Sequence, residues 1–568
     1  MDYKKLVAEV LAVHTDLRRR DLMPAIETPQ DAKLGDMAFP CFRLSKALKK
    51  APPMIATDLA AKITKDKPAW LESAVATGPY VNFFFHRATF AKEVLGKILA
   101  AGLDYGKTGI GDGKNVVMDY SSPNIAKPFH VGHLGSTIIG LSLDKIHRFL
   151  GYNVTSINYL GDWGTQFGKV IVAYLKWGSK EDVDKDGINS LVELYVRFHE
   201  EADKAPTLND EARAWVVKLA QGDEEGLKLW QWFVDISLVE YKKLYARLKM
   251  DYDVYSGESK YNGKMEATVA LIREKGLLEE SDGAQIVNLA DYNMPPCLIL
   301  RRDGGTLYPT RDITAAMDRY NSYKFDKSLY VTGQEQNLHF AQFFKVLELM
   351  GFPWAKDMVH IPYGLFRFET GKLSTRRGDV IKMEDLLDEA VAKTLAIIEE
   401  KNPSLENKAQ VAEDVGIGAL IFNKLFTNRI KDTVFSWDLM LNFDGETGPY
   451  VQYAHARACS VLRKAGYTPG SAADFDPALL VEDEAYEVFR IIYDFPGKIA
   501  EAAYKYEPFI IARQLVALSQ AFNVFYHHHV VLVDDGKLKA SRLALVDAVR
   551  TQLEIGLGLL GMGAPTEM

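Results

Sequence analysis

The feature that most constrains the fold is a strand, a helix and a second strand that follow one another between Asn115 and Leu160. VVMDYSS has the pattern of a short buried strand, residues 131–150 have helical periodicity and end before Gly151, and residues 153–160 form a second strand. Such a unit builds a parallel sheet with a right-handed crossover, and ligands of parallel sheets bind outside the carboxyl ends of the strands. The sequence therefore predicts an α/β domain with its ligand site at the first strand-to-helix loop.

The rest of the chain is arranged around this unit. Residues 1–106 combine amphipathic helices with a β-rich stretch and end in a glycine-rich linker, which predicts a small α/β domain. We expect a Rossmann-like parallel-sheet catalytic domain at 114–400, with a mostly helical insertion at about 170–283. Helical periodicity dominates residues 401–568, which predicts an all-α C-terminal helix bundle.

The totals exclude several classes of protein. With 68 basic and 76 acidic residues the formal charge is -8, so nucleic-acid binding would have to come from local basic segments. Cys41–Lys50 and Lys372–Lys382 are two such segments, although composition alone favours a solvated face for each. The three cysteines lie far apart and indicate neither a disulfide framework nor a zinc ribbon. We see no apolar run of membrane length and expect a cytoplasmic protein without a membrane partner.

The loop SSPNIAKPFHVGHLGST, Ser121–Thr137, has the composition of an anion site. Unpaired N–H groups and the dipole at a helix N-terminus favour negative charge, and Gly132 lets a ligand approach the backbone closely. His130 and His133 would share one face of the first helical turn, and Lys127 adds a positive charge. A His-x-x-His pair also occurs as surface decoration or as half of a metal site, so this loop alone leaves nucleotide binding open.

A second glycine-flanked basic loop, GKLSTRRGD at 371–379, has the composition of a phosphate clamp and is also ambiguous by itself. Three adjacent histidines, residues 527–529, cannot all face one ligand on a helix. We therefore predict no metal site in the chain.

Considered together, the motifs resemble a known family. HVGH at 130–133 is similar to the HIGH signature of class I aminoacyl-tRNA synthetases, and KLSTR at 372–376 is similar to their KMSKS loop. The ordered segments around them resemble arginyl-tRNA synthetases over nearly the whole chain: SSPNIAKPFHVGHL, NYLGDWGTQFGK, YPTRDITAA and GPYVQYAHAR.

The resemblance implies arginine-tRNA ligase activity in two steps. Arginine and ATP would give arginyl-adenylate and pyrophosphate, and the arginyl group would then pass to the 2'-hydroxyl of the terminal adenosine of tRNA(Arg). Attack of a carboxylate on the α-phosphate needs no general base, so positioning and charge stabilisation of pyrophosphate would supply the acceleration. The implied partners are L-arginine, ATP with Mg2+, and tRNA(Arg), and we expect a monomer.

By similarity, particular side chains take particular roles. The catalytic group is His130, His133, Lys127, Lys372 and Arg376. The ATP-binding group is His130, Gly132, His133, Lys372, Leu373 and Ser374. The arginine-binding group is Asp119, Asn124, His130, Tyr308, Asp312 and Gln336. The tRNA-binding group is Tyr80 and Asn82 at the outer corner and D-loop, with Tyr450 and Tyr453 at the anticodon.

Single residues in these groups also have ordinary structural explanations. A guanidinium has five donors in one plane, which suits a pocket of carboxylates and hydroxyls, but an aspartate near a helix N-terminus is more often a cap. The spacing of Tyr450 and Tyr453 equally fits a packed helix face.

Two positions depart from the family pattern. Thr375 stands where the general class I signature has its second lysine, and Lys127 is thought to substitute for that charge in the arginyl family. Gly135 stands where the family most often has arginine. These departures motivate one alternative, a catalytically weakened tRNA-binding paralogue. Another class I synthetase or a nucleotidylyltransferase is a further alternative, against which the acidic pocket and the N-terminal extension argue.

Overall fold

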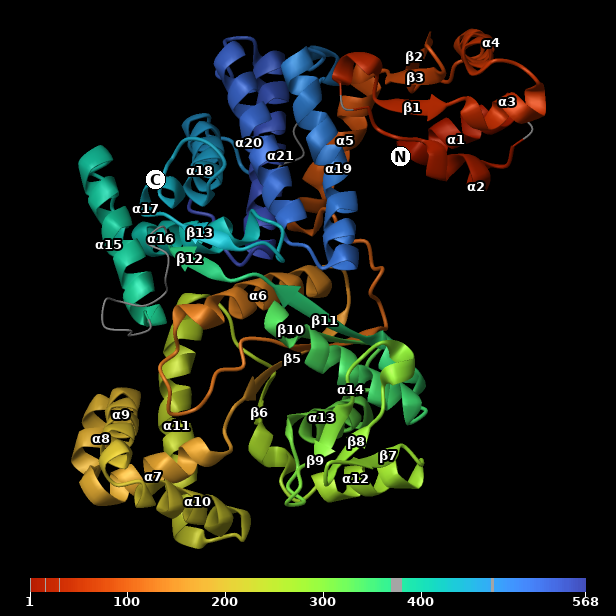
Figure 1. The fold of residues 1–568 in the computed structure, drawn as a ribbon. Helices are drawn as coiled ribbons and strands as arrows, with labels where there is room; N and C mark the ends of the chain where they lie inside the picture. Colours follow the sequence, from red (N-terminus) through yellow and green to blue (C-terminus); the bar gives the residue numbers. More distant parts are fainter. Residues whose placement is uncertain (1, 16, 30, 369–380, 471–474) are drawn as a thin grey trace. The chain divides into compact units, whose positions relative to one another are not determined.

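The computed structural model describes residues 2–15, 17–29, 31–368, 381–470 and 475–568 (Figure 1). Its chain divides into two compact units. Unit 1 contains residues 1–105, 457–495 and 517–552, and unit 2 contains residues 106–456, 496–516 and 553–568. Segments near the C-terminus thus share a unit with the N-terminal residues, an arrangement that periodicity alone does not signal.

Unit 1 contains an antiparallel sheet of order β1-β3-β2, formed by β1 (Met37–Pro40), β2 (Leu71–Thr77) and β3 (Tyr80–Phe85). The turn at Gly78 and Pro79 joins β2 to β3, as the sequence predicts. The N-terminal helices are α1 (Tyr3–Val13), α2 (Arg19–Leu22), α3 (Phe42–Leu48), α4 (Pro52–Lys65) and α5 (Arg87–Ala101). Tyr3 packs against Phe85 and Tyr493, with ring centroids 4.5 Å and 5.6 Å away.

The main sheet of unit 2 is parallel and has the order β11-β10-β4-β5-β6. Its strands are β4 (Asn115–Asp119), β5 (Asn153–Leu160), β6 (Val254–Gly257), β10 (Lys327–Gly333) and β11 (Met358–Tyr363). The order of strands along the chain reverses between β4 and β10, which is where doubly wound sheets bind ligands. The predicted α/β class with a Rossmann-like sheet is confirmed.

Several strands differ from what the sequence predicts. β6 lies inside the range expected for the insertion, and β11 was not predicted. Residues 284–308 are rich in strand-forming side chains, which predicts strands of the main sheet. They contribute instead β8 (Ala284–Val287) and β9 (Cys297–Leu300) to a separate antiparallel sheet with β7 (Leu278–Ser281). β6 and β7–β9 have four residues each, too few for periodicity to identify their sheet.

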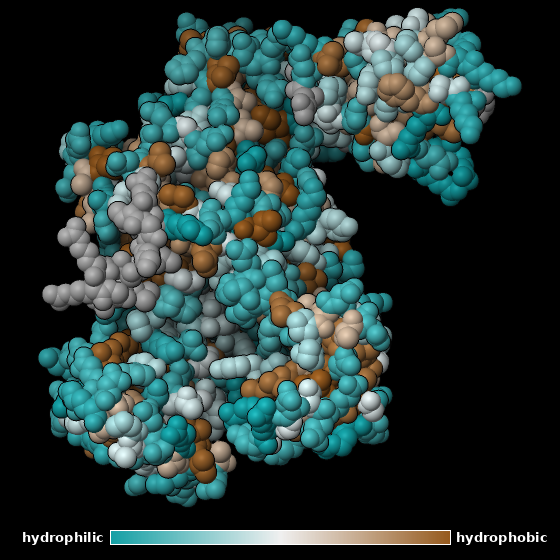
Figure 2. Space-filling view, viewed as in Figure 1, coloured by the Kyte–Doolittle hydropathy of each residue, from teal (hydrophilic) through white to brown (hydrophobic). Residues whose placement is uncertain are grey.

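Helices account for most of the remaining chain. α6 (Leu134–Phe149) follows a 3-10 turn at Val131–His133, and α7 to α11 form the predicted helical insertion. The insertion helices are α7 (Thr165–Trp177), α8 (Lys180–Asp186), α9 (Ile188–Lys204), α10 (Thr207–Ala220) and α11 (Glu224–Arg247). Figure 2 shows that the visible surface of α7 to α10 is mostly hydrophilic, with scattered apolar residues.

Further helices follow the insertion and reach the C-terminus. Those of unit 2 are α12 (Met265–Glu274), α13 (Tyr308–Tyr323), α14 (Asn337–Leu349), α15 (Met383–Lys401), α16 (Lys408–Leu425) and α17 (Trp437–Met440). The C-terminal helices are α18 (Gly448–Lys464), α19 (Asp483–Lys505), α20 (Phe509–His528) and α21 (Gly536–Leu559). Strands β12 (Phe366–Phe368) and β13 (Thr433–Phe435) form a small parallel pair. The C-terminal region is helical as predicted, except that β13 lies within the range expected to be all-α.

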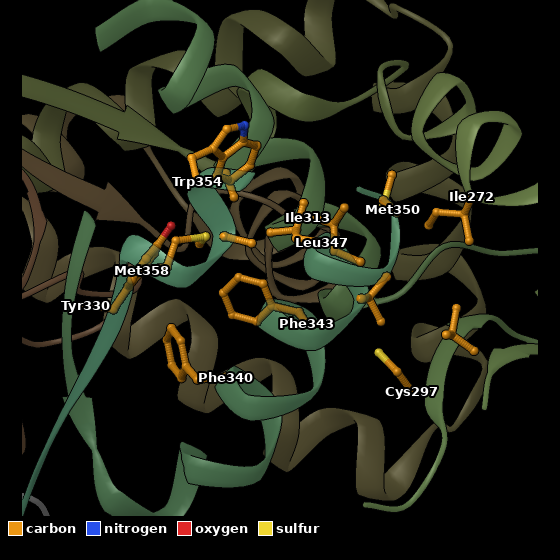
Figure 3. Packing of buried hydrophobic residues seen from close by; sticks show 14 of the residues in the cluster. Ile272, Cys297, Ile313, Tyr330, Phe340, Phe343, Leu347, Met350, Trp354 and Met358 are labelled. Carbon is orange, nitrogen blue, oxygen red and sulfur yellow. The ribbon is translucent and has the colours of Figure 1, made fainter. Parts of the chain in front are cut away.

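A hydrophobic core fixes α13 and α14 beside the main sheet (Figure 3). Phe343 and Leu347 of α14 are fully buried, and the ring of Tyr330 on β10 lies 5.3 Å from Phe340 and 6.0 Å from Phe343. Burial of one such side chain contributes about 1.5–3 kcal/mol. This packing holds the N-terminal ends of both helices in place, and they carry the predicted residues Tyr308 and Gln336.

One described helix, α20, is long and apolar enough to cross a membrane by length and composition, with a mean hydropathy of 1.2. Half of that apolar window is buried inside the protein. The sequence analysis saw no apolar run of membrane length, so it missed that this helix meets the criterion of length and composition.

Candidate active site

A cavity of about 600 Å³ lies in unit 2 at the carboxyl ends of the central strands. Asp119 ends β4, Gly333 ends β10, Gly161 follows β5 and Gly132 lies in the turn before α6, and all four line the cavity. This is the ligand position that the strand order indicates.

The structure brings most of the predicted site residues of the catalytic domain together in this cavity. Its lining includes Asp119, Asn124, His130, Gly132, His133, Tyr308, Asp312 and Gln336. Lys127 belongs to the same loop but not to the lining. Four predicted residues lie outside the described part of the chain: Lys372, Leu373, Ser374 and Arg376.

The two histidines form a capping pair at the start of the turn before α6. His130 Nδ1 accepts a hydrogen bond from the backbone N–H of Gly132 (3.0 Å), and His133 Nδ1 lies 3.2 Å from the backbone nitrogen of His130. The His130 ring therefore carries its proton on Nε2, whereas Nδ1 of His133 also lies 3.2 Å from the carbonyl oxygen of His130 and accepts or donates there according to its tautomer. The ring centroids are 4.1 Å apart.

Burial keeps both imidazoles uncharged near neutral pH. Burial, with the nearby charge of Lys127, lowers the pKa of His130. Burial, with His130 beside it, lowers the pKa of His133 to about 3. The pair therefore offers neutral N–H donors to a phosphate rather than positive charges.

The carboxylate of Asp119 already has an ion-pair partner and a hydrogen-bond donor within the protein. Arg319 Nη2 lies 2.7 Å from Asp119 Oδ2, and Ser122 Oγ donates to Asp119 Oδ1 (2.8 Å). The Arg319 side chain is only 3% exposed. Its guanidinium lies 5.0 Å and 5.3 Å from the ring centroids of Tyr159 and Tyr330, so both rings add cation–π stabilisation. The buried pair leaves Asp119 with little uncompensated charge.

Of the two predicted carboxylates, Asp312 is the one whose negative charge is not paired with an arginine or lysine in the described part of the chain. Its Oδ2 lies 2.6 Å from Nε2 of His339, which also lines the cavity, and the Asp312 side chain remains partly exposed. A third carboxylate, Glu258, pairs with Arg311 at 3.0 Å. Burial raises the pKa of Glu258 to about 7, and Arg311 opposes that shift.

The sequence analysis did not find Glu258, Arg319 or His339. Arg319 lies two helical turns after Asp312 on α13, a spacing that could have placed both on one face. Glu258 follows the short β6 and has no periodic signal around it. His339 is near Gln336 in sequence, but its pairing depends on the packing of α14 against α13.

Gly135 lies in α6 directly against the ring of Tyr363 at the end of β11. A Cβ atom at position 135 would be 2.7 Å from Cε2 of that ring. Tyr363 is buried and lines the cavity. The glycine therefore makes room for an aromatic wall of the site.

The predicted tRNA-binding residues of unit 1 differ in accessibility. Tyr80 on β3 is partly exposed, and its ring lies 6.1 Å from that of Phe42, which is exposed. Asn82 is buried, and its amide donates to Thr77 Oγ1 (3.1 Å) across the hairpin. This geometry fits Tyr80 as an RNA contact and does not fit Asn82 as a direct one, because Asn82 is used to join β2 and β3.

On α18, Tyr450 and Tyr453 are partly exposed, whereas Gln452 and His455 are buried. Gln452 donates to the carbonyls of Asp414 and Gly563, and His455 Nδ1 lies 3.0 Å from the carbonyl of Pro565. The sequence analysis selected only Tyr450 and Tyr453 from this segment, and the helix places both at the surface while it turns Gln452 and His455 into the core.

Within the described ranges, no group of three or more histidine, cysteine, aspartate or glutamate side chains could hold a metal ion.

Comparison with known families covers almost the whole chain. The sequence model of class I (R) tRNA synthetase catalytic domains matches residues 94–437. That of the DALR anticodon binding domain matches residues 451–568, and that of the arginyl tRNA synthetase N terminal domain matches residues 1–85.

Individual relatives agree with these matches. The chain is 53% identical to the arginine--tRNA ligase of Alkaliphilus metalliredigens and 48% identical to that of Clostridium perfringens, each over the full length of both chains. Among solved structures, arginyl-tRNA synthetase of Thermus thermophilus has a TM-score of 0.80 at 25% identity, covering 100% of this chain and 99% of the other.

Proposed function

The chain belongs to the arginyl-tRNA synthetase family, and from this premise we propose that the cavity of unit 2 carries both steps of arginine–tRNA ligation. ATP is the co-substrate in this family. The observation that supports the proposal most directly is the position of Asp312, whose carboxylate lines a cavity that also contains two neutral histidine donors.

In the first step, a carboxylate oxygen of arginine attacks the α-phosphorus of ATP. The bond between that phosphorus and the bridging oxygen of pyrophosphate breaks, and no proton has to move. We assign the Nε2–H groups of His130 and His133 to the phosphate oxygens, and the charge of Lys127 to the departing pyrophosphate. Mg2+ would enter with the phosphates of ATP, its usual oxygen ligands.

The basic loop at 371–379 would supply further groups for ATP and pyrophosphate, and their roles are assigned from the sequence alone. Lys372 and Arg376 would close over pyrophosphate, and Leu373 and Ser374 would contact ATP, by their places in the motif that resembles KMSKS. Gly132 would lie against the adenine, because it has no side chain to keep a flat ring away.

In the second step, the 2'-oxygen of the terminal adenosine attacks the carbonyl carbon of arginyl-adenylate. The bond from that carbon to the AMP oxygen breaks, and the hydroxyl proton leaves with AMP or solvent. The enzyme's task is again to hold the two groups in line.

Selection of arginine rests on the acidic side of the cavity. We propose that Asp312 and Tyr308 of α13 bind the guanidinium, and that Asn124 and Gln336 hold the amino end. Asp119 would contribute to guanidinium binding with a carboxylate that also forms an ion pair with Arg319. A site of this kind rejects uncharged analogues strongly, because buried polar groups would be left without partners.

We assign tRNA(Arg) contacts to Tyr80 in unit 1 and to Tyr450 and Tyr453 on α18, as rings on which bases can stack. Asn82 would support the hairpin that presents Tyr80. Residues 1–106 would serve the outer corner of the tRNA, residues 114–400 catalysis, and residues 401–568 the anticodon. The proposed state is a cytoplasmic monomer.

Arginine-dependent ATP–pyrophosphate exchange, run with and without tRNA(Arg) and compared across amino acids, tests this proposal. Exchange with arginine and with no other common amino acid supports it. Selective exchange with a different amino acid would overturn the assignment of the pocket. Absence of exchange, with tRNA still bound, would identify a binding paralogue.

A further inference from the structure

The loop between β4 and α6 has an unusual backbone. Ser121, Ser122 and Ala126 have φ values of 70°, 49° and 57°. These left-handed conformations are unfavourable for residues with a Cβ atom and persist only where the surroundings enforce them. The same loop carries Asn124 into the cavity and Lys127 beside the histidine pair.

Helix α11 of the insertion supplies hydrogen bonds to this loop from one of its faces. Ser237, Tyr241 and Tyr245 are spaced four residues apart, so they lie in a row along the helix. We call these three residues the loop clamp. All three side chains are buried, with at most 1% of each residue exposed.

Each member of the loop clamp contacts the loop at a different point. Ser237 Oγ accepts from the backbone N–H of Ala126 (3.2 Å), and Tyr245 Oη lies 2.9 Å from Ser121 Oγ. Tyr241 Oη lies between two backbone carbonyls, 2.7 Å from that of Asn124 and 2.8 Å from that of Lys127. The single hydroxyl of Tyr241 therefore joins the two residues of the loop to which a substrate role is assigned.

The opposite side of the loop is fixed by the main sheet. The backbone N–H of Ile125 donates to the carbonyl of Gly161, and the N–H of Gly161 donates to the carbonyl of Pro123, both at 3.1 Å. The loop is thus held between the end of β5 and a helix that lies about eighty residues further along the chain. Removal of the clamp would free one side only, which permits a small shift rather than unfolding.

We propose that Tyr241 is a positioning residue for adenylate formation, and that with Ser237 and Tyr245 it holds the strained loop in its reactive placement. This inference rests on the proposed function, since it assumes that Asn124 and Lys127 act on arginine and ATP. Reaction rates depend steeply on such placement, and a displacement of about 1 Å can cost about 100-fold. The insertion would therefore contribute to catalysis without touching a substrate.

The test compares Tyr241→Phe with Tyr105→Phe. Tyr105 is a matched control because its buried hydroxyl also donates to a backbone carbonyl, that of Ile492 (3.0 Å), but in unit 1. Each change removes one buried hydroxyl whose proton is donated to a backbone carbonyl oxygen, and their thermal unfolding should be similar. The measurements are arginine-dependent ATP–pyrophosphate exchange with tRNA(Arg), and hydrogen exchange of the peptide that covers residues 121–130.

We expect Tyr241→Phe to lower kcat by about tenfold with KM for arginine and ATP nearly unchanged, and to speed hydrogen exchange in residues 121–130. Adding Ala126→Gly to Tyr241→Phe should recover part of kcat, because glycine adopts a positive φ without a steric penalty. Tyr105→Phe should change neither measurement.

Equal kcat and equal hydrogen exchange in the two variants would overturn the inference. If the unmodified protein shows no pyrophosphate exchange, the proposed function fails. In that case hydrogen exchange alone tests whether the loop clamp holds the loop. Faster exchange of residues 121–130 in Tyr241→Phe supports this part of the inference, and unchanged exchange overturns it.

Discussion

The Cα atom of Gly135 lies against the ring of Tyr363, so that a Cβ at this position would come within 2.9 Å of two ring carbons. A side chain at position 135 would displace this ring. The end of β11 thus provides a buried aromatic wall of the cavity. The packing of Tyr363 gives a structural reason for glycine at this position.

Gly135→Ala should weaken the interaction of the protein with ATP. Overpacking of this contact costs about 1–3 kcal/mol, partly offset by the roughly 1 kcal/mol that alanine gains over glycine in a helix. We expect a higher KM for ATP in pyrophosphate exchange and a KM for arginine that changes less. Gly497→Ala is the matched control, since Gly497 is also helical and an alanine Cβ there would meet nothing within 4 Å apart from its chain neighbours and the adjacent backbone of its own helix.

The added change Tyr363→Leu should reduce the cost of Gly135→Ala, because the clashing ring carbons are gone. Strictly additive effects of the two changes on KM for ATP would contradict the matched packing of positions 135 and 363.

Asp312→Asn should raise KM for arginine by one to two orders of magnitude, since a hydrogen bond to a charged group contributes about 1.5–3 kcal/mol. Asp318→Asn is the control on the same helix, because Asp318 pairs with Lys260 (2.7 Å) and does not line the cavity. An arginine KM that is the same for both variants would remove Asp312 from the pocket.

Lys127→Ala should slow adenylate formation much more than it weakens tRNA binding. Its charge is close enough to lower the pKa of both His130 and His133, although burial is the larger cause. Pre-steady-state formation of arginyl-adenylate and filter binding of tRNA(Arg) measure the two effects. Lys243→Ala, which removes an exposed lysine of α11, should alter neither, and equal adenylate rates in the two variants would refute the role of Lys127.

Lys424 predicts a dependence of stability on alkaline pH. It is buried in α16, donates to the carbonyl of Gly364 (2.9 Å) and to Thr433 Oγ1 (3.3 Å), and holds the start of β12 to β13. Burial lowers its pKa from 10.5 to about 8, with Asp432 opposing the shift.

Because the folded pKa of Lys424 is the lower one, the unfolded chain binds more protons between pH 8 and 10.5. Stability should therefore rise with pH through that window by up to about 3 kcal/mol relative to Lys424→Met, which cannot titrate. Urea unfolding of both proteins at pH 7.5 and about pH 9.5 measures this difference. Parallel pH profiles would show that Lys424 is not desolvated.

The main elements could be predicted because their signals are local. Helix α5 ends at Gly102, β4 to β5 form a complete strand–helix–strand pattern, and the cavity residues of the catalytic domain lie in contiguous motifs. What could not be predicted depends on pairing across the fold. Arg319 meets Asp119 from 200 positions away, and β6 is recognisable as a strand of the main sheet only from its neighbour β5.

Asn82 and Gln452 show that burial, too, could not be predicted from the sequence. Both are polar residues in segments that suggested RNA contacts, yet both are buried and use their amides to join backbone or hairpin neighbours. A single sequence gives the chemistry of a side chain, whereas its exposure depends on the elements that pack around it.

Because Arg319 pairs with Asp119, the structure of the proposed arginine pocket depends on correct incorporation of arginine at position 319. Arginine at position 319, like every other arginine of the protein, is delivered during synthesis by charged tRNA(Arg). If citrulline were charged in its place, the side chain would keep its shape but lose its charge, and Asp119 would remain buried without its cation. A mischarged arginine tRNA would thus give rise to molecules with a defect in the proposed arginine pocket.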